Sequence, residues 1–331
     1  MVRSDNAHHL KIYETQRKKI EARISGLFRN RKPASLYEPC TYIMQSGGKR
    51  LRPLLVLLSA KSVNSEYNQV YNAAVAVEIL HNFTLVHDDI MDNADKRRGR
   101  LTIHKKYDLS TAILTGDNLI AIAYQILLKD CRDNDNRVLN TFTKGVIEVC
   151  EGQSLDKEFE IRNEVTLPEY MIMIRKKTAA LAEMCCALGG QLGRGTDEQI
   201  NALTRYGRNL GIAFQIQDDL LDITAEEAEF GKIIGGDLVE GKKTFLFLKA
   251  LEKAKGKTKT ELTKVIRNKG IPREEVDKYR DIYCNLGILD ETRQEIISYT
   301  ARALREIKHL ENLEGKEMLQ WLANNLIRRS K

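Results

Sequence analysis

The stretch VYNAAVAVEILHNFTLVHDDIMD, residues 70–92, decides the fold class. The residues that recur three or four positions apart in it are Val70, Ala73, Ala74, Val77, Leu80 and Thr84. This spacing lines one face of an α-helix, whereas side chains of a strand alternate between two faces. The same periodicity predicts further helices over residues 110–130, 136–161, 168–193, 198–224, 244–256, 273–286, 292–311 and 315–328. We therefore expect an all-α fold without strands, with central helices that are apolar on more than one face.

Proline and glycine predict where these helices begin and end. Pro168 followed by Glu169 is typical of a helix start, because proline is tolerated in the first turn and acids favour the positive end of the helix. The glycines expected to break or cap helices are Gly47-Gly48, Gly99, Gly189-Gly190 and Gly235-Gly236.

Composition indicates a soluble globular protein. Of the 331 residues, 42% are hydrophobic and 30% charged, and no Pro/Gly/Ser-rich linker divides them, so we expect a single domain over residues 1–331. Six cysteines form no CxxC pair, and neither a signal peptide nor a transmembrane run is recognisable, which favours the cytoplasm. The net charge of +7 fits either a soluble surface or a small anionic partner. No nucleic-acid-binding motif is present.

Two acidic clusters share one arrangement. DDIMD places Asp88, Asp89 and Asp92 at helical positions i, i+1 and i+4, and DDLLD repeats this at residues 218–222. Like charges on one helix face repel, and acids near a helix C-terminus oppose its dipole, so a cation is expected to offset both costs. Carboxylate oxygens select hard cations, and Mg²⁺ usually binds one or two carboxylates together with substrate phosphates. The alternate-residue spacing of an EF-hand is absent.

Basic residues follow these clusters and glycine breaks. SGGKRLRP places Lys49, Arg50 and Arg52 after Gly47-Gly48, but it lacks the spacing of a P-loop. KRRGR, residues 96–100, follows the first acidic cluster and could either neutralise it or contact phosphate. Lys177-Thr178 lies within an otherwise apolar helix. The lysine there needs a partner of opposite charge or must extend its side chain to solvent. FGKIIGGDLVEGKKT, residues 230–244, is a glycine-rich loop of the kind that forms lids.

In this order, the segments resemble the trans-isoprenyl diphosphate synthase family. The motifs that carry the resemblance between Tyr42 and Thr244 are GGKRLRP, DDIMD with RRGR, GQSLD, KT, FQIQDDLLD, GK and GKKT. The family implies the isoprenoid synthase fold, a bundle of long antiparallel helices around a deep central cavity, usually in a homodimer. It also implies condensation of isopentenyl diphosphate with an allylic diphosphate, through ionisation, condensation and elimination. Gly236, where relatives often carry Ser or Thr, is a small departure.

The resemblance also implies roles for individual residues. Asp88 and Asp92 resemble ligands of two Mg²⁺ ions and Asp218 that of a third. Supporting positions are Asp89, Asp219, Asp222, Gln153 and Asp156. Those resembling the isopentenyl diphosphate site are Lys49, Arg52, His81 and Arg98, although His81 alone could be a core or capping histidine. Those resembling the allylic diphosphate site are Arg97, Lys177, Lys232 and Lys242. Thr178 and Gln215 are expected to turn their oxygens toward the reacting carbon.

Product length is expected to depend on the helix that bears DDIMD. Phe83 and Thr84 lie about one turn before Asp88, or about 6–7.5 Å along the axis. Phe83 could be an ordinary core residue. An aromatic residue followed by a small one at this place resembles archaeal geranylgeranyl diphosphate synthases, in which the aromatic ring closes the product cavity. We therefore expect a C20 product with some C15.

The acidic clusters by themselves would also fit three other classes of protein. A class I terpene cyclase would not need GGKRLRP or a second complete DDxxD motif. A catalytically silent subunit of a heteromeric synthase would not need all the aspartates and lysines. A structural metal-binding protein would not need the basic residues. We expect an Mg²⁺-dependent prenyltransferase.

Overall fold

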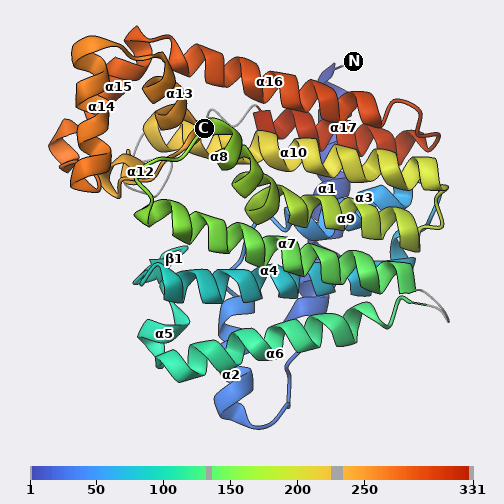
Figure 1. Ribbon diagram of the computed structural model, residues 1–331. Helices are drawn as coiled ribbons and strands as arrows, with labels where there is room; N and C mark the ends of the chain where they lie inside the picture. Colours follow the sequence, from blue (N-terminus) through green and yellow to red (C-terminus); the bar gives the residue numbers. More distant parts are fainter. Residues whose placement is uncertain (1, 132–135, 225–233, 328–331) are drawn as a thin grey trace. The chain divides into compact units, whose positions relative to one another are not determined.

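Helices make up most of the described backbone (Figure 1). The computed structural model describes residues 2–131, 136–224 and 234–327. These residues form two compact units, and several helices contribute to both. The first unit comprises the chain up to Leu139, Cys185–Ile200 and Leu310–Leu319. The second comprises Asn140–Met184, Asn201–His309 and the chain from Gln320.

The first unit is built on the helix that bears DDIMD. The elements that begin in it are α1 (Val2–Ser25), α2 (Ala34–Met44), α3 (Leu51–Ser62), the 3-10 turn η1 (Tyr67–Gln69), α4 (Tyr71–Met91), β1 (Lys96–Arg97), β2 (Arg100–Leu101), α5 (Ile103–Lys106), α6 (Leu109–Leu127) and α7 (Asn136–Ile161). Helix α4 packs against α3 and, along most of its length, against α6; Figure 1 shows α4 and α6 running side by side. Because both faces of its first half are covered, Ala73–Leu80 is buried without interruption.

The second unit carries the remaining helices. They are α8 (Leu167–Ile174), the π-helical turn η2 (Arg175–Ala179), α9 (Ala180–Leu192), α10 (Asp197–Thr224), α12 (Gly236–Val239), α13 (Phe245–Lys253), α14 (Gly256–Asn268), η3 (Arg273–Glu275), α15 (Val276–Asn285), α16 (Ile288–Glu306) and α17 (Leu313–Ile327). Both α9 and α10 extend into the first unit, as does the start of α17. The core of the second unit joins α8 and α10 to α13, α15 and α16 through residues such as Ile216, Phe247 and Tyr283.

The expected all-α class is confirmed, although particular elements differ from the prediction. The prediction contained no helix before residue 70 and none over α14. The predicted helix 168–193 forms without a gap in the sequence, but a π-helical turn divides it into α8 and α9. The helix start at Pro168 is confirmed: Thr166 caps it, and the Glu169 side chain accepts from the Thr166 N–H at 2.8 Å in a complete capping box. No described helix has the length and hydropathy needed to cross a membrane.

The glycine pairs have different roles. Gly47, Gly48, Gly99 and Gly235 have positive φ angles, as expected for breaks and caps. Gly189-Gly190 does not break the chain but lies within α9, so the predicted break is wrong. A Cβ on Gly189 would lie 2.3 Å from the Val56 carbonyl oxygen, which shows that the glycine is needed for close packing on α3.

A minimal hairpin follows the first acidic cluster, although no strand was predicted. Arg97 pairs with Arg100 across a two-residue turn in which Arg98 and Gly99 both have positive φ. Positive φ at both positions matches the twist of a two-residue hairpin loop. The pairing covers only two residues on each side, too few for alternating hydrophobicity to reveal it.

Candidate active site

The first acidic cluster lies at the C-terminal end of α4, where Asp92 is the C-cap. Asp88 is 22% exposed and Asp92 is exposed, whereas Asp89 is only 2% exposed. From the hairpin, Arg97 donates through Nε to Asp89 Oδ1 at 2.6 Å and through Nη2 to Asp88 Oδ2 at 3.4 Å. Burial raises the pKa of Asp89, and Arg97 only partly opposes this effect. The structure thus shows Arg97 paired with Asp89 and Asp88, while Asp88 and Asp92 stay more exposed than Asp89.

Two arginines and a histidine lie next to the glycine break. Arg98 donates to the Gly47 carbonyl and, at 3.3 Å, to Ser46 Oγ, which ties the hairpin to this break. Arg52 Nη1 lies 3.1 Å from His81 Nε2. Burial lowers the pKa of His81, and the neighbouring arginines lower it further, so the ring is neutral. Because Arg52 can only donate, Nε2 accepts and the ring proton is on Nδ1. Lys49 is exposed.

Arg50, which lies between Lys49 and Arg52 in the sequence, is only 2% exposed and has a left-handed backbone conformation. It donates to Glu78 at 2.5 Å, to Glu21 at 2.8 and 3.2 Å, and to the Met44 carbonyl at 3.0 Å. Burial lowers the pKa of Arg50, but Glu21 and Glu78 together raise it by more. Arg50 therefore fixes the start of α3, which carries Arg52, to α4, which carries His81.

Phe83 and Thr84 lie on α4 one turn before the aspartates. The Phe83 ring meets the His87 ring edge-on, with 4.9 Å between centroids. His87 in turn lies against α6, where a Cβ on Gly116 would approach its Nε2 to 2.1 Å. Thr84 donates its hydroxyl to the His81 carbonyl at 2.8 Å. Phe83 thus has a defined neighbour within the first unit, but its proposed effect on product length stays a prediction.

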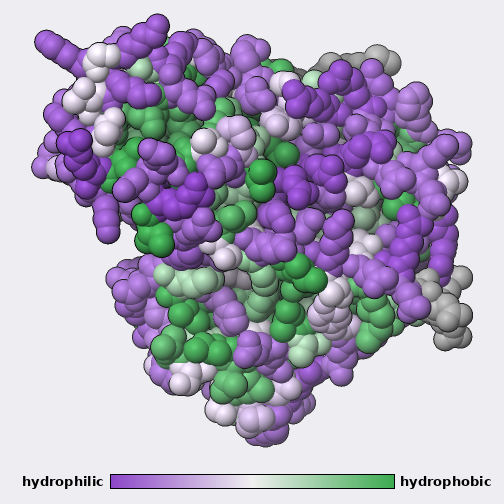
Figure 2. Space-filling model, in the orientation of Figure 1, coloured by the Kyte–Doolittle hydropathy of each residue, from purple (hydrophilic) through white to green (hydrophobic). Residues whose placement is uncertain are grey.

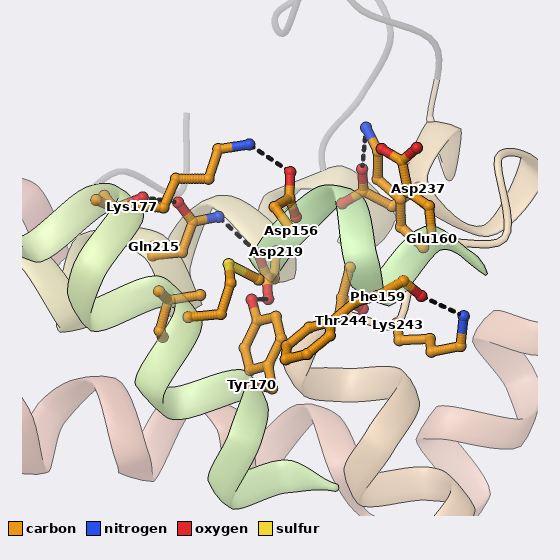
Figure 3. Close-up of a pocket in the computed structure, with 14 residues that line it drawn as sticks. Asp156, Phe159, Glu160, Tyr170, Lys177, Gln215, Asp219, Asp237, Lys243 and Thr244 are labelled. Atoms are coloured by element: carbon orange, nitrogen blue, oxygen red, sulfur yellow. Dashed lines mark hydrogen bonds and ion pairs between the residues drawn. The ribbon is translucent and has the colours of Figure 1, made fainter. Parts of the chain in front are cut away.

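The second unit contains a pocket beside the second acidic cluster (Figure 3). Predicted residues that line it are Asp156, Lys177, Thr178, Gln215, Asp219 and Lys242. They come from α7, the π-helical turn, α10 and the segment before α13. Apolar walls are supplied by residues such as Phe159 and Ile174. Acidic, basic and neutral polar groups that are far apart in the sequence therefore meet in one pocket.

The π-helical turn sets the position of Lys177 and Thr178. Lys177 Nζ donates to Asp156 Oδ2 at 2.5 Å, which joins the predicted KT and GQSLD motifs. A Cβ on Gly152 would lie 2.1 Å from the Lys177 backbone nitrogen, so only glycine permits this approach of α7. Wider turns of this type commonly occur at functional sites. Gly152 was not predicted as a site residue, although it begins the GQSLD motif.

The three aspartates of the second cluster differ in environment. Asp218 and Asp222 are partly exposed, whereas Asp219 is 6% exposed. Asp219 Oδ2 accepts from the Tyr170 hydroxyl and from the Phe245 N–H at 3.0 Å, and its Oδ1 accepts from Gln215 Nε2 at 2.9 Å. Burial raises the pKa of Asp219 to about 7, with a further rise from Asp237, although these three donors lower it.

The hydrogen-bonded chain continues from Gln215 to Thr178. Thr178 donates its hydroxyl to Gln215 Oε1 at 2.8 Å. Figure 3 shows Gln215 with its nitrogen toward Asp219, and Tyr170 approaching Asp219 from below. The resemblance implies that both Thr178 and Gln215 turn their oxygens toward the reacting carbon, and the structure links the two residues by a hydrogen bond.

The glycine-rich segment before α13 is fixed to the end of α10. The Asp237 N–H donates to Asp222 Oδ2 at 3.2 Å, and the Gly235 N–H donates to the Asp222 carbonyl at 2.7 Å. Lys242 lies 2.7 Å from Glu240 and 3.7 Å from Asp237. Lys243, another basic residue of this glycine-rich segment, donates to the Phe159 carbonyl at 2.8 Å, and burial lowers its pKa. Lys232 lies outside the described residues.

Within the described ranges, no three side chains of His, Cys, Asp or Glu gather closely enough to hold a metal ion alone. The donor chemistry nevertheless fits Mg²⁺, which commonly completes its shell with water and substrate phosphate. In each cluster the second aspartate binds protein donors: Asp89 binds Arg97 and Asp219 binds Tyr170. The more exposed carboxylates at the first and last positions are the ones suited to a metal.

Comparison with known proteins identifies the family. A model of the polyprenyl synthetase family matches residues 33–283. The chain belongs to this family. Geranylgeranyl diphosphate synthase of Methanosarcina mazei is 39% identical over 318 residues, 94% of each chain, and that of Sulfolobus acidocaldarius is 39% identical over 302 residues, 89% of this chain and 91% of the relative. This polyprenyl synthetase is therefore a prenyltransferase.

The solved structures agree with this assignment. Geranylgeranyl pyrophosphate synthetase from Pyrococcus horikoshii matches with a TM-score of 0.91 and 35% identity, over 97% of this chain and 98% of that one. Heptaprenyl diphosphate synthase from Staphylococcus aureus matches with a TM-score of 0.87 and 31% identity, over 96% and 99%. The expected isoprenoid synthase fold is confirmed.

Sequence reasoning missed the roles of several residues that organise the site. Arg50 was named with Lys49 and Arg52 as a basic residue after the glycine break, whereas it is buried and bound to Glu78, which lies within the apolar stretch that predicted α4. Tyr170 gave no signal, because its partner Asp219 is 49 residues away. Long-range partners of this kind cannot be read from local spacing.

Proposed function

We propose that this polyprenyl synthetase condenses isopentenyl diphosphate with allylic diphosphates (dimethylallyl, geranyl and farnesyl) and releases mainly the C20 product, geranylgeranyl diphosphate. Release of some farnesyl diphosphate is also part of the proposal. The observation that carries it is the α10 arrangement, in which Asp218 and Asp222 stay accessible while Asp219 orders Gln215 and Thr178. The names of the archaeal relatives support the C20 product.

Magnesium fits the proposed reaction as the cofactor, with about three ions per site. Asp88, Asp92 and Asp218 would hold it, and Asp89, Asp219, Asp222 and Asp156 would support them. When bound, the metal neutralises the charge that develops on the departing diphosphate. Since Lys177 and Lys242 are cationic and line the same pocket, they would bind the allylic diphosphate there, with Lys232 and Arg97 as further proposed contacts.

Uncharged oxygen atoms are suited to stabilising the positive charge that forms on carbon during the reaction. Thr178 and Gln215 would stabilise the allylic cation with oxygen lone pairs, without forming a covalent bond to it. The apolar walls formed by Phe159 and Ile174 would limit access of water to this cation. The double bond of isopentenyl diphosphate then forms the new carbon–carbon bond, and the proton lost from the adduct passes to the released diphosphate. No protein nucleophile is required.

Isopentenyl diphosphate is assigned to the basic residues of the first unit. Lys49, Arg52, His81 and Arg98 would bind its diphosphate. In support, Arg52 and His81 are held in contact, and the neutral His81 ring carries its proton on a buried Nδ1 that has no hydrogen-bond partner among the described residues. Arg98 already donates to Gly47, so its proposed contact with phosphate would use its remaining N–H groups.

Phe83 is proposed to limit product length. Replacing Phe83 with alanine removes the ring that packs on His87, so the products should shift beyond C20. Reversed-phase chromatography of the dephosphorylated products measures the shift. Thr84→Ser, which keeps a small residue and the hydroxyl, is the matched control and should retain the C20 profile. A wild-type product profile from Phe83→Ala would remove Phe83 from this role.

A homodimer is also proposed, because apolar side chains are exposed on one helix. Leu109, Ile113 and Leu114 of α6 are 54%, 43% and 59% exposed. Figure 2 shows hydrophobic surface gathered over this helix. Light scattering should give twice the mass of the chain, and a monomeric mass at assay concentrations would contradict the proposal. The cysteines are free thiols, which supports a reducing, cytoplasmic location.

The proposed function is tested with purified protein, Mg²⁺, labelled isopentenyl diphosphate and each allylic primer in turn. We expect elongation with all three primers and its loss on chelation with EDTA, with recovery on adding excess Mg²⁺. Asp92→Asn should lower the rate strongly. The distant surface variant Asp290→Asn should not, since Asp290 is 85% exposed on α16. Cyclic hydrocarbon without elongation would instead indicate a terpene cyclase.

A further inference from the structure

Tyr170 is a buried tyrosine of α8 whose ring belongs to the core of the second unit. Its residue exposure is 3%, and its hydroxyl donates to Asp219 Oδ2. The Phe245 N–H donates to the same oxygen at 3.0 Å. Oδ2 is therefore held by one side-chain donor from α8 and one backbone donor from α13, and these two elements restrain the carboxylate. Packing alone would not need this hydroxyl.

The fixed carboxylate determines which way the Gln215 amide faces. Oδ1 of Asp219 accepts a hydrogen bond at 2.9 Å, and only the nitrogen of the amide can donate it. Oε1 must consequently face away from Asp219. It does so and accepts the Thr178 hydroxyl proton at 2.8 Å. The direction of the Gln215 amide dipole is thus imposed by Asp219.

The same argument extends to Thr178. Since its hydroxyl proton points to Gln215, the oxygen lone pairs of Thr178 point elsewhere, and Gln215 Oε1 keeps a second lone pair. Every donor in the chain points toward the carboxylate, and the negative ends of the dipoles therefore point away from it. Thr178, Gln215 and Asp219 all line the pocket. The arrangement suits a cation that forms next to Thr178 and Gln215.

We propose that Tyr170 is a positioning residue for prenyl transfer, which acts through Asp219 to keep the oxygens of Gln215 and Thr178 turned toward the allylic cation. The inference rests on the proposed function but assigns a role to a residue outside its catalytic set. Tyr170 itself need not touch the reacting carbon. Without its hydroxyl, Asp219 keeps only the Phe245 N–H on Oδ2, and the carboxylate and Gln215 gain rotational freedom.

Tyr170→Phe tests this role because it removes one oxygen and leaves the ring. Direct removal of a preorganised group commonly lowers kcat by about 10²–10³. For a residue acting one step away, we expect a fall of about tenfold in kcat, with the KM of either diphosphate changed less than about twofold. Tyr279→Phe is the matched control, because Tyr279 is also buried but donates to the Glu261 carbonyl outside the pocket. It should retain wild-type kcat.

A double-mutant cycle separates positioning from a general loss of structure. If Tyr170 acts through Asp219 and Gln215, the Tyr170→Phe effect should shrink from about tenfold to less than about threefold in a Gln215→Leu background, which removes the link to both oxygens. Equal effects in both backgrounds would overturn the inference, as would a Tyr170→Phe variant that matches Tyr279→Phe in kcat. Thermal melting of all variants identifies any loss of folded protein, and rates are expressed per folded chain. Wild-type protein that forms no elongated product would instead refute the proposed function itself.

Discussion

Arg50 in the first unit and Asp219 in the second are both buried charges, but their partners differ in kind. Arg50 is surrounded by the carboxylates of Glu78 and Glu21, so its charge is matched by opposite charge. Asp219 receives hydrogen bonds from Tyr170, Gln215 and Phe245, and all three of these donors are uncharged. One buried charge is neutralised, whereas the other is held by neutral dipoles.

This difference in partners has a physical consequence. An ion pair of full opposite charges has little field left to act elsewhere, and its main effect is to fix the elements that carry it. A carboxylate held by neutral donors orders their dipoles and is not neutralised by them. The pKa values agree: carboxylate partners raise that of Arg50, which favours its charged form, while burial raises that of Asp219, which disfavours its charged form. We infer that Arg50 mainly serves stability and Asp219 mainly serves the reaction.

The largest effect on rate is expected from Asp219→Asn. Tyr170 and Phe245 both donate to the Oδ2 position, so the oxygen of the new amide must remain there and its nitrogen must face Gln215. The Gln215 amide would then reverse and present its nitrogen to Thr178. We expect kcat to fall by about 10³, while the free energy of unfolding changes by less than about 1 kcal/mol, because the volume is kept and a buried charge is lost.

Steady-state kinetics and urea denaturation of the same preparation check both halves of this prediction. Asp290→Asn is the control for the chemical change itself, because Asp290 is exposed on α16. A variant that keeps wild-type kcat would show that the orientation of Gln215 is unimportant. A large loss of stability would show that Asp219 resembles Arg50 after all.

The largest effect on stability is expected from Arg50→Met. This change fills a similar volume but leaves Glu78, whose side chain is only 3% exposed, without its cation. Breaking a buried pair on one side costs about 3–5 kcal/mol. Chemical denaturation should show this loss, and the additional change Glu78→Gln should recover part of it. A loss below about 1 kcal/mol would mean that water reaches Glu78, and the contrast with Asp219 would fail.

The sequence predicted which chemical groups these regions contain better than it predicted the backbone conformation and packing that hold them in place. Periodicity identified α4, α7 and α10, and the paired aspartates identified where a cation could bind. It did not predict the π-helical turn at Lys177, because that turn depends on the absence of a side chain at Gly152, 25 positions earlier on another helix. Gly189-Gly190 was misread for the same reason: a glycine that allows helix packing looks like a glycine that ends a helix.

The inner partners were beyond prediction on similar grounds. Glu78 lies in an apolar run, and nothing in its neighbourhood indicates that its partner is Arg50 at the start of another helix. Asp88 and Asp89 are equivalent in sequence, yet one is partly exposed and the other lies under Arg97 because of a hairpin only two residue pairs long. Burial, which decides between a metal ligand and a structural carboxylate, is a property of the folded chain.

The smallest effect is expected from Glu21→Gln. Glu21 is the second carboxylate of the Arg50 cluster, but its side chain is 39% exposed, so solvent screens its interaction. We expect a loss of stability of no more than about 1 kcal/mol, measured by the same denaturation as for Arg50→Met. Glu14→Gln on the same helix, at 38% exposure and paired only with Arg17, is the matched control. A loss of stability equal to that of Arg50→Met would show that the exposure of a carboxylate does not predict how much its pairing with Arg50 stabilises the protein.

The central claim is that the accessible aspartates and the oriented oxygens beside them support prenyl transfer to a C20 product. The most direct test is a reaction of the purified protein with farnesyl diphosphate, labelled isopentenyl diphosphate and Mg²⁺, followed by chromatography of the dephosphorylated product. We expect one main labelled product that comigrates with the C20 alcohol geranylgeraniol. Absence of a labelled elongated product from folded protein would contradict it.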